Sequence, residues 1–305
     1  MDRPTVALDA LETADHVLDG PCGGVPVRVY RRPHGEAPQS GAPALVWAHG
    51  GGFAYGDLEM PEADWVARSL AARGIPVISV DYRLAPPVDA LDPGELRQSD
   101  PQGGVHHPVP GEELAAAFDW ARGHAAEFGV DRQRISIGGA SAGANLAAGV
   151  VLSRLGSSAP LPAQLLLAYP TLHAVQRPVP PALRALLDAD PGADRFGPES
   201  RRRIYENYLG GPLEDAPVDA VPGTAEVEQL SGHPPVTIAT DEVDELRISA
   251  EAYAESLWQA GADVEIERVP GVRHGHLNRP YDGPDAEQAA EQTIEQFAAR
   301  LQRAI

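Results

Sequence analysis

Short apolar runs rich in β-branched residues alternate with longer helical patterns along most of this 305-residue chain. Such alternation predicts an α/β fold, with a mostly parallel central sheet and helices on both of its faces. The functional site of such a sheet lies at the carboxyl ends of its strands. The two leading strands are too close in sequence for a helical crossover, so we expect them to run antiparallel. The predicted strands are 25–31, 44–48, 75–80, 135–137, 165–168, 236–239 and 264–267, and the predicted helices are 62–73, 112–128, 142–155, 249–260 and 286–304.

Three segments do not follow this alternation. Residues 87–107 are rich in Pro, Gly, Asp and His, which predicts a surface loop. Residues 172–208 contain two short helical patterns, at 181–187 and 198–208, and residues 1–20 contain a single weak one. We expect the segments 1–20 and 172–208 to pack together as a small helical cap over the sheet. No linker or internal repeat divides the sequence, so the whole chain is predicted to form a single domain.

The chain is acidic, with 24 basic and 44 acidic side chains and a formal net charge of −20. Such a surface repels phosphate backbones and anionic lipids, so nucleic-acid and membrane partners are disfavoured. All of the basic side chains are Arg, and the lack of Lys excludes a Schiff base to pyridoxal phosphate and a P-loop lysine. We expect this charge to keep the chain soluble, and it says little about the reaction.

Cys22 is the single cysteine of the chain, which precludes an intramolecular disulfide and fits a reducing compartment. We interpret Cys22 as an unreactive turn residue rather than a nucleophile, because Pro21, Gly23 and Gly24 surround it. The N-terminal sequence lacks the charged-then-apolar pattern of a signal peptide, and no apolar run approaches the roughly 20 residues of a membrane span. These features together predict a cytoplasmic protein.

The candidate nucleophile is Ser141, in the sequence Gly-Ala-Ser-Ala-Gly at residues 139–143. This G-x-S-x-G motif lies between a predicted strand and a predicted helix, where a sharp turn strains the serine backbone and requires small flanking residues. The turn lifts the hydroxyl clear of the sheet and places the Ala142 N–H at a helix N-terminus, where it favours a developing oxyanion. The alternative is a tight turn in which Ser141 only caps the helix. The strand–turn–helix context favours the nucleophile.

A glycine-rich loop follows the predicted strand 44–48 and reads His-Gly-Gly-Gly-Phe at residues 49–53. Three consecutive glycines cost backbone entropy and contribute no packing, so they indicate a backbone that approaches a ligand closely. In acyl-transfer enzymes the N–H groups of such a loop bind the tetrahedral oxyanion. A flexible loop or a phosphate-binding turn is the alternative, but no Gly-Lys-Ser ending or helix follows here.

A serine nucleophile at neutral pH needs a base, and His274 and His276 lie in a loop after the last predicted strand. We choose His274 because Gly275 gives its loop the freedom to project the side chain. His276 is the second choice, and otherwise a polar wall of the pocket. His173 lies in the predicted cap, and His233 precedes a strand, at the wrong end of the sheet.

The acid that orients this histidine is expected after the predicted strand 236–239. Asp241 lies closer to the end of the strand, whereas Asp244 lies just before the next helix. Periodicity does not decide between them.

These motifs together resemble those of the bacterial hormone-sensitive-lipase-like esterases, and the resemblance extends from Val25 to the C-terminus. The matching segments are His-Gly-Gly-Gly-Phe at 49–53, Asp-Tyr-Arg-Leu-Ala-Pro at 81–86, the serine motif at 139–143, Asp-Glu-Leu-Arg at 244–247 with Glu-Ala-Tyr-Ala at 251–254, and His-Gly at 274–275.

The resemblance implies the α/β-hydrolase fold and selects Asp244 as the acid. It also implies that the N–H groups of Gly51, Gly52 and Ala142 are the oxyanion donors. A cap built from N-terminal and mid-chain helices is implied for residues 1–20 and 172–208. Neither a metal nor an organic cofactor is needed for this chemistry.

The sequence departs from the family pattern at positions expected to border the pocket. Residues 88–106 have the character of an insertion, and Ala140, Pro87, Glu245 and His276 replace the usual Asp, Glu, Pro and Phe. The departures leave the candidate Ser, Asp and His in place but affect the substrate range. We predict that the pocket includes Phe53, Tyr82 and His276.

The expected function is a serine carboxylesterase that hydrolyses short-chain, acetyl-type esters through an acyl-enzyme. Ser141 would attack, His274 would move the proton, and Asp244 would orient the histidine. Amide or N-acetyl hydrolysis and lactone opening are alternatives for the same residues, and a non-catalytic ligand-binding receptor is a further one. The expected partner is a small-molecule ester, with at most a second copy of the chain in a homodimer.

Overall fold

The computed structural model describes residues 7–33, 41–91, 98, 104–193 and 196–303. Within these residues, eight strands form one sheet in the order β1-β2-β4-β3-β5-β6-β7-β8. Strands β3 to β8 are mutually parallel. Strand β2 pairs antiparallel with both of its neighbours, β1 and β4. The strands are β1 (Glu12–Gly20), β2 (Gly23–Arg31), β3 (Ala42–Ala48), β4 (Val77–Val80), β5 (Val130–Ala140), β6 (Leu165–Ala168), β7 (Val236–Val243) and β8 (Val264–Arg273).

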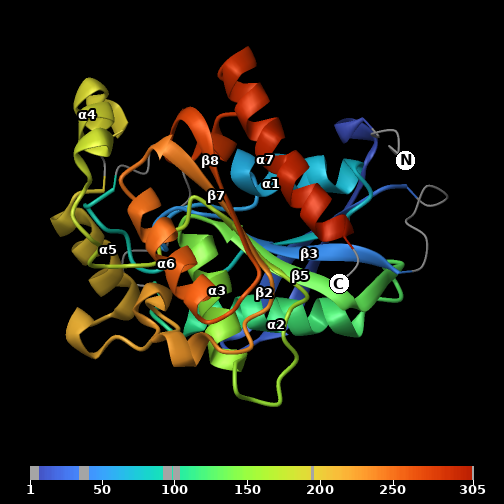
Figure 1. Ribbon diagram of the computed structural model, residues 1–305. Coiled ribbons are helices and arrows are strands. Elements are labelled where there is room, and N and C mark those ends of the chain that lie inside the picture. The colour runs from blue at the N-terminus through green and yellow to red at the C-terminus, as the bar shows by residue number, and fades with distance from the viewer. Residues whose placement is uncertain (1–6, 34–40, 92–97, 99–103, 194–195, 304–305) are drawn as a thin grey trace.

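Helices cover both faces of this sheet (Figure 1). Helices α1 and α7 pack on one face, and α2, α3 and α6 pack on the other. The mostly parallel sheet with helices on both faces is therefore confirmed. The helices are α1 (Pro61–Ala72), α2 (Val109–Gly123), α3 (Ala142–Arg154), α4 (Pro181–Ala189), α5 (Pro198–Leu209), α6 (Arg247–Gln259) and α7 (Pro284–Gln302).

The two leading predicted strands, β2 and β3, run in opposite directions as expected. They are not neighbours, because β4 lies between them and pairs antiparallel with β2 and parallel with β3. The antiparallel edge thus stops at β4, and every strand beyond it points its carboxyl end to the same side of the sheet.

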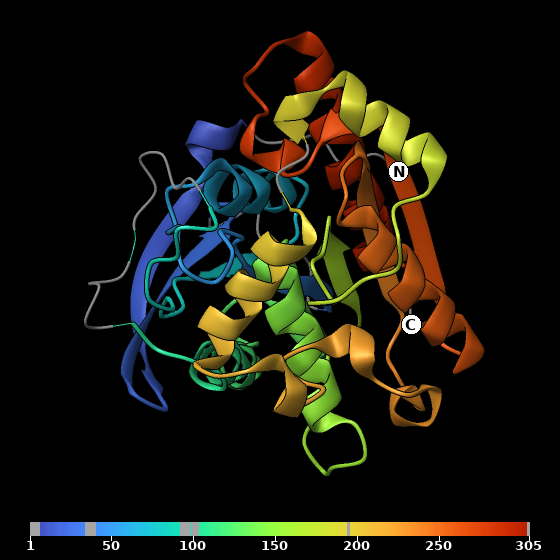
Figure 2. The same ribbon diagram turned by 90° about the vertical axis from the view of Figure 1, so that its left-hand side faces the viewer.

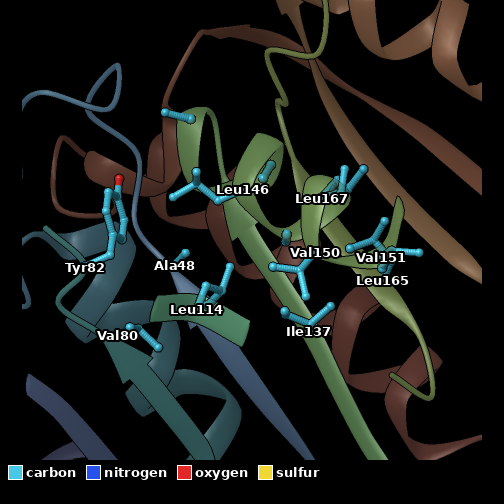
Figure 3. Packing of buried hydrophobic residues seen from close by; sticks show 14 of the residues in the cluster. Ala48, Val80, Tyr82, Leu114, Ile137, Leu146, Val150, Val151, Leu165 and Leu167 are labelled. Atoms are coloured by element: carbon cyan, nitrogen blue, oxygen red, sulfur yellow. The ribbon is translucent and has the colours of Figure 1, made fainter. Parts of the chain in front are cut away.

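Helix α3 is the most deeply buried helix of the site-bearing face. Twelve of its residues are buried, which its Ala- and Gly-rich sequence permits by allowing close approach to the sheet. Figure 3 shows Leu146, Val150 and Val151 of this helix against the sheet residues Ile137 and Leu167. This packing fixes the beginning of α3, where the candidate nucleophile lies.

The N-terminal segment does not form the predicted cap helix. Residues 12–20 form β1, an edge strand whose register with β2 is set by the two-residue turn at Pro21 and Cys22. Most side chains of β1 are exposed, so the strand lacks the apolar alternation that would have identified it. Of the predicted segment 1–20, residues 1–6 lie outside the described part of the chain.

The mid-chain segment 172–208 contains the two predicted helices, α4 and α5 (Figure 2). Helix α5 lies beside α3, since the Tyr205 hydroxyl donates a hydrogen bond to Asn145 Oδ1 at 3.0 Å. Helix α4 packs on α6 through Leu183, Leu187 and Ile248. Of the expected inserted loop 88–106, residues 92–97 and 99–103 lie outside the described residues.

Candidate active site

Ser141 occupies a strained turn between β5 and α3. Its backbone angles are φ 51° and ψ −112°, a region that side-chain-bearing residues rarely adopt. The Ser141 N–H donates to the Ala168 carbonyl at 2.9 Å, which ties the turn to the end of β6. A Cβ at Gly143 would meet the carbonyl oxygens of Ala48 and His49. Glycine is required there because the turn packs directly on the end of β3.

The loop after β3 folds into a compact turn beside Ser141. Gly51 and Gly52 have φ angles of 105° and 60°, and both residues line a cavity that also contains Ser141. The Tyr55 N–H donates to the Gly51 carbonyl at 3.0 Å, and a Cβ on Gly51 would meet the Tyr55 carbonyl. The third residue named as an oxyanion donor, Ala142, directly follows Ser141 and begins α3.

Ser141, His274 and Asp244 form a continuous hydrogen-bonded chain. His274 Nε2 lies 3.0 Å from Ser141 Oγ, and His274 Nδ1 lies 2.8 Å from Asp244 Oδ2. The other Asp244 oxygen accepts the Leu246 N–H at 2.9 Å, which holds the fully buried carboxylate in place. Gly275, at φ 79°, lets the chain reverse directly after the histidine.

Opposing effects act on the pKa of the partly buried His274. Burial lowers this pKa, whereas the charge and the hydrogen bond of Asp244 raise it, and Asp241 and Glu62 add smaller contributions in the same direction. The net result is a pKa above the usual 6.5. The site therefore stabilises the imidazolium that forms when the histidine accepts a proton.

Glu62 is part of the site but was not identified from the sequence, where it marked only the start of a helix. Its buried carboxylate accepts the Gly50 N–H at 2.5 Å and the Tyr169 hydroxyl at 2.7 Å. Burial raises the pKa of Glu62, and these two hydrogen bonds oppose the rise. Glu62 thus anchors the glycine loop to the end of β6 from the wall of the cavity.

A cavity of about 300 Å³ opens over the reactive groups. The segment 172–208 supplies one part of its wall, with Phe196, Arg201, Ile204 and Tyr205. Its remaining lining residues are Gly51, Gly52, Tyr55, Met60, Pro61, Glu62, Leu91, Ser141, Thr171, Leu246, His274, Gly275, Asn278 and Arg279. The space is mostly apolar, with the Ser–His pair exposed to it, as expected of a small-molecule site.

Two of the predicted pocket residues lie behind the glycine loop instead. Tyr82 is buried, stacks on His49 at a centroid distance of 4.4 Å, and donates its hydroxyl to the His49 carbonyl at 2.9 Å. Phe53 is also buried and stacks on Tyr208 at 4.0 Å. Neither residue lines the cavity, so the pocket prediction is wrong for both. Their large rings fill the space under the loop and support it.

The prediction that His276 forms a polar wall of the pocket is also wrong. His276 is buried, with Nδ1 2.7 Å from Asp241 Oδ1 and Nε2 2.9 Å from Thr293 Oγ1 of α7. Its ring points away from the cavity because Gly275 reverses the chain between the two histidines. Asp241, the alternative acid, therefore pairs with His276 and not with His274.

In the parts of the chain that the structure describes, no group of three His, Cys, Asp or Glu side chains could hold a metal ion. Over the same residues, no helix combines the length and the apolar character needed to cross a membrane.

The sequence model of a protein family described as "alpha/beta hydrolase fold" matches residues 45–90 and 105–278. The chain belongs to this family. Within it, the chain is one of the hormone-sensitive-lipase-like carboxylesterases. The match is interrupted at residues 91–104, inside the segment 88–106 that the sequence marks as an insertion.

Several relatives of the chain are esterases. Carboxylesterase NlhH of Mycobacterium tuberculosis is 34% identical over 92% of this chain and 79% of its own length. Ethyl acetate hydrolase of Pseudomonas putida is 28% identical over 91% of this chain and 79% of its own. The solved structure of an esterase from Pyrobaculum calidifontis superposes with a TM-score of 0.77 at 28% identity, covering 95% of this chain and 84% of its own. This member of the family is accordingly a carboxylic ester hydrolase.

Proposed function

We propose that this carboxylesterase hydrolyses esters of short acyl chains, with Ser141, His274 and Asp244 as its catalytic triad. The observation that carries the proposal is the 3.0 Å contact between Ser141 Oγ and His274 Nε2 at a cavity, with His274 Nδ1 on a buried aspartate. A serine hydroxyl becomes a competent nucleophile when such an oriented base accepts its proton.

In the first step, Ser141 Oγ attacks the ester carbonyl carbon while His274 Nε2 accepts the hydroxyl proton. The tetrahedral intermediate collapses, the bond to the alcohol oxygen breaks, and His274 returns the proton to the departing alcohol. In the second step a water molecule gives a proton to His274 and attacks the acyl-enzyme. The carboxylic acid leaves, and Ser141 recovers its proton. Asp244 keeps Nδ1 protonated and stabilises the imidazolium throughout.

The oxyanion of each tetrahedral intermediate would accept hydrogen bonds from the N–H groups of Gly51, Gly52 and Ala142. Gly51 and Gly52 line the cavity beside Ser141, and Ala142 is the first residue of α3, where the helix dipole favours negative charge. The hydrogen bond from the Gly50 N–H to Glu62 supports this assignment, because it fixes the loop before any substrate arrives.

A short acyl group is favoured by the size of the cavity and by what closes it. The volume of about 300 Å³ must hold both the acyl and the alcohol parts, and the large side chains of Phe196, Ile204 and Tyr205 form part of its wall. The relative named ethyl acetate hydrolase supports the same substrate class.

The test is a ladder of 4-nitrophenyl esters from acetate to dodecanoate, assayed with the wild type, Ser141→Ala and the control Ser153→Ala. We expect the largest kcat/KM at two to four acyl carbons, no measurable turnover by Ser141→Ala, and wild-type rates for Ser153→Ala. Fluorophosphonate should label the wild type and the control but not Ser141→Ala. A folded wild type that is neither labelled nor active would overturn the triad, and a maximum at long chains would overturn the acyl preference.

A further inference from the structure

The charged groups on the cavity wall contrast with the charge of the whole chain. The chain carries a formal charge of −20, yet among the described residues the acidic and basic side chains that line the cavity, apart from His274, are Arg201, Arg279 and Glu62. Two basic side chains and one acidic side chain thus line the cavity, whereas acidic side chains outnumber basic ones in the whole chain. The three groups differ in the partners that each one has inside the protein.

Two of the three groups are already held by partners inside the protein. Glu62 accepts the Gly50 N–H and the Tyr169 hydroxyl, and burial raises its pKa, which works against a full negative charge on this side chain. Arg201 forms a buried ion pair with Glu245, at 2.8 Å between Nη1 and Oε1. The cap residue Arg201 thus brings no net charge to the cavity, because its counter-ion lies against it.

Arg279 differs from both. Its Nη2 donates to the carbonyl oxygen of His274 at 2.5 Å and, less closely, to that of Arg273 at 3.4 Å. Over the residues that the structure describes, Arg279 forms no ion pair with a carboxylate. Carbonyl oxygens orient a guanidinium without neutralising it, and the two contacts use only part of its five N–H donors.

We propose that Arg279 binds a carboxylate of the substrate, so that the preferred substrates are short esters that carry a second, ionised carboxyl group. This inference rests on the proposed function, because it places the ester at Ser141 in the same cavity. A planar guanidinium matches the two oxygens of a carboxylate in a charge-assisted fork. One uncompensated cation favours a single negative charge, whereas a dianionic phosphate would leave one charge unpaired in a mostly apolar space.

The position of Arg279 connects this anchor to the reaction. The guanidinium is held on the carbonyl of His274, and the backbone N–H of Arg279 donates to the His276 carbonyl at 3.0 Å. A carboxylate bound there lies beside the loop that carries the base. Binding of the remote group would thereby orient the ester without touching the atoms that react.

The test uses two pairs of esters, each with one charged and one neutral member. In 4-acetoxybenzoate and its methyl ester the charge lies on the alcohol side, and in monoethyl and diethyl glutarate it lies on the acyl side. Because the members differ in intrinsic reactivity, the ratio of kcat/KM for charged over neutral ester is compared between enzymes. Arg279→Gln is the test variant. Arg273→Gln is the matched control, since Arg273 precedes His274 on the same loop, pairs with Asp190 and lies outside the cavity.

We expect Arg279→Gln to lower the charged-to-neutral ratio by about tenfold or more in at least one pair, the loss of one charge-assisted contact. Arg273→Gln should keep both ratios within about twofold of the wild type. Ratios that stay within twofold in Arg279→Gln for both pairs overturn the proposal. An equal loss on charged and neutral esters also overturns it, because Arg279 would then only support the histidine loop. Fluorophosphonate labelling and neutral-ester turnover by the wild type separate these outcomes from a failure of the triad itself.

Discussion

His274 and His276 lie two residues apart after β8, and each binds an aspartate through Nδ1, at 2.8 and 2.7 Å. The Nε2 atom of each then meets a hydroxyl, Ser141 Oγ at 3.0 Å in one case and Thr293 Oγ1 at 2.9 Å in the other. The same three chemical groups therefore occur twice in one loop region. They differ in what surrounds the hydroxyl.

Ser141 lies on a strained turn at the cavity, whereas Thr293 lies within the regular helix α7 and is buried. The Thr293 hydroxyl also contacts the Ala289 carbonyl at 3.4 Å, one helical turn earlier. No ester can reach a hydroxyl packed inside a helix–sheet interface. The comparison teaches that a hydroxyl–imidazole–carboxylate chain is catalytic only where the backbone exposes the hydroxyl to a cavity, and that the second chain instead joins α7 to the sheet.

The largest expected difference between the two chains is in activity. His274→Ala should lower kcat for 4-nitrophenyl acetate by about 10⁴- to 10⁶-fold, because it removes the base from a unit that acts together. His276→Ala should retain kcat within about tenfold when assayed well below its melting temperature. Both variants are compared by circular dichroism to verify folding. A folded His276→Ala as inactive as His274→Ala would break the distinction.

The hydrogen bonds that join Asp241, His276 and Thr293 should instead contribute to the free energy of unfolding. Asp241→Ala leaves the buried His276 without its partner and should lower the free energy of unfolding by about 2–4 kcal/mol. Replacing both side chains, in Asp241→Ala with His276→Phe, should recover part of that loss, since the imidazole is then no longer left without its partner and only the His276 N–H loses Asp241 Oδ2. Urea denaturation of the two single variants and the double variant measures the coupling. Additive losses in the double variant would show that the pair contributes no specific interaction.

The smallest expected effect is on the pH dependence of activity, through the charge of Asp241 acting on His274. The base must be neutral to accept a proton, so kcat/KM should rise with pH through the pKa of His274, which lies above 6.5. The charge of Asp241 helps to raise this pKa. Asp241→Asn should consequently move the acid limb of the pH profile to lower pH by a fraction of a unit. Asp285→Asn, at the start of α7, is the control and should leave the profile unchanged. An acid limb that stays in place or moves to higher pH would contradict electrostatic contact between the chains.

The sequence allowed prediction of those parts of the site that depend on local backbone chemistry. A glycine-bounded serine, a triple-glycine loop and a histidine before glycine each have a backbone requirement that the residues themselves reveal. Their convergence follows from the parallel sheet, because the carboxyl ends of its strands meet at one edge.

The parts that could not be predicted depend on side-chain direction and long-range packing. His276 follows the same strand as His274, and only the reversal at Gly275 shows that it points into the core. Glu62 reaches Gly50 from a neighbouring helix, a contact that has no sequence signature. Strand β1 was missed because its solvent-facing side chains leave no apolar alternation, so that only its pairing with β2 defines it.

The left-handed backbone of Ser141 also limits how this enzyme can evolve. Residues branched at Cβ are outliers at positive φ, so threonine cannot replace the serine without distorting the turn. The neighbouring Gly143 is equally restricted, because any side chain there would meet the end of β3. Substitution is thereby strongly restricted at these two positions of the nucleophile turn. Cavity-wall residues such as Phe196 and Ile204 have no such backbone requirement, so specificity can change there by point substitution while the attacking hydroxyl is retained.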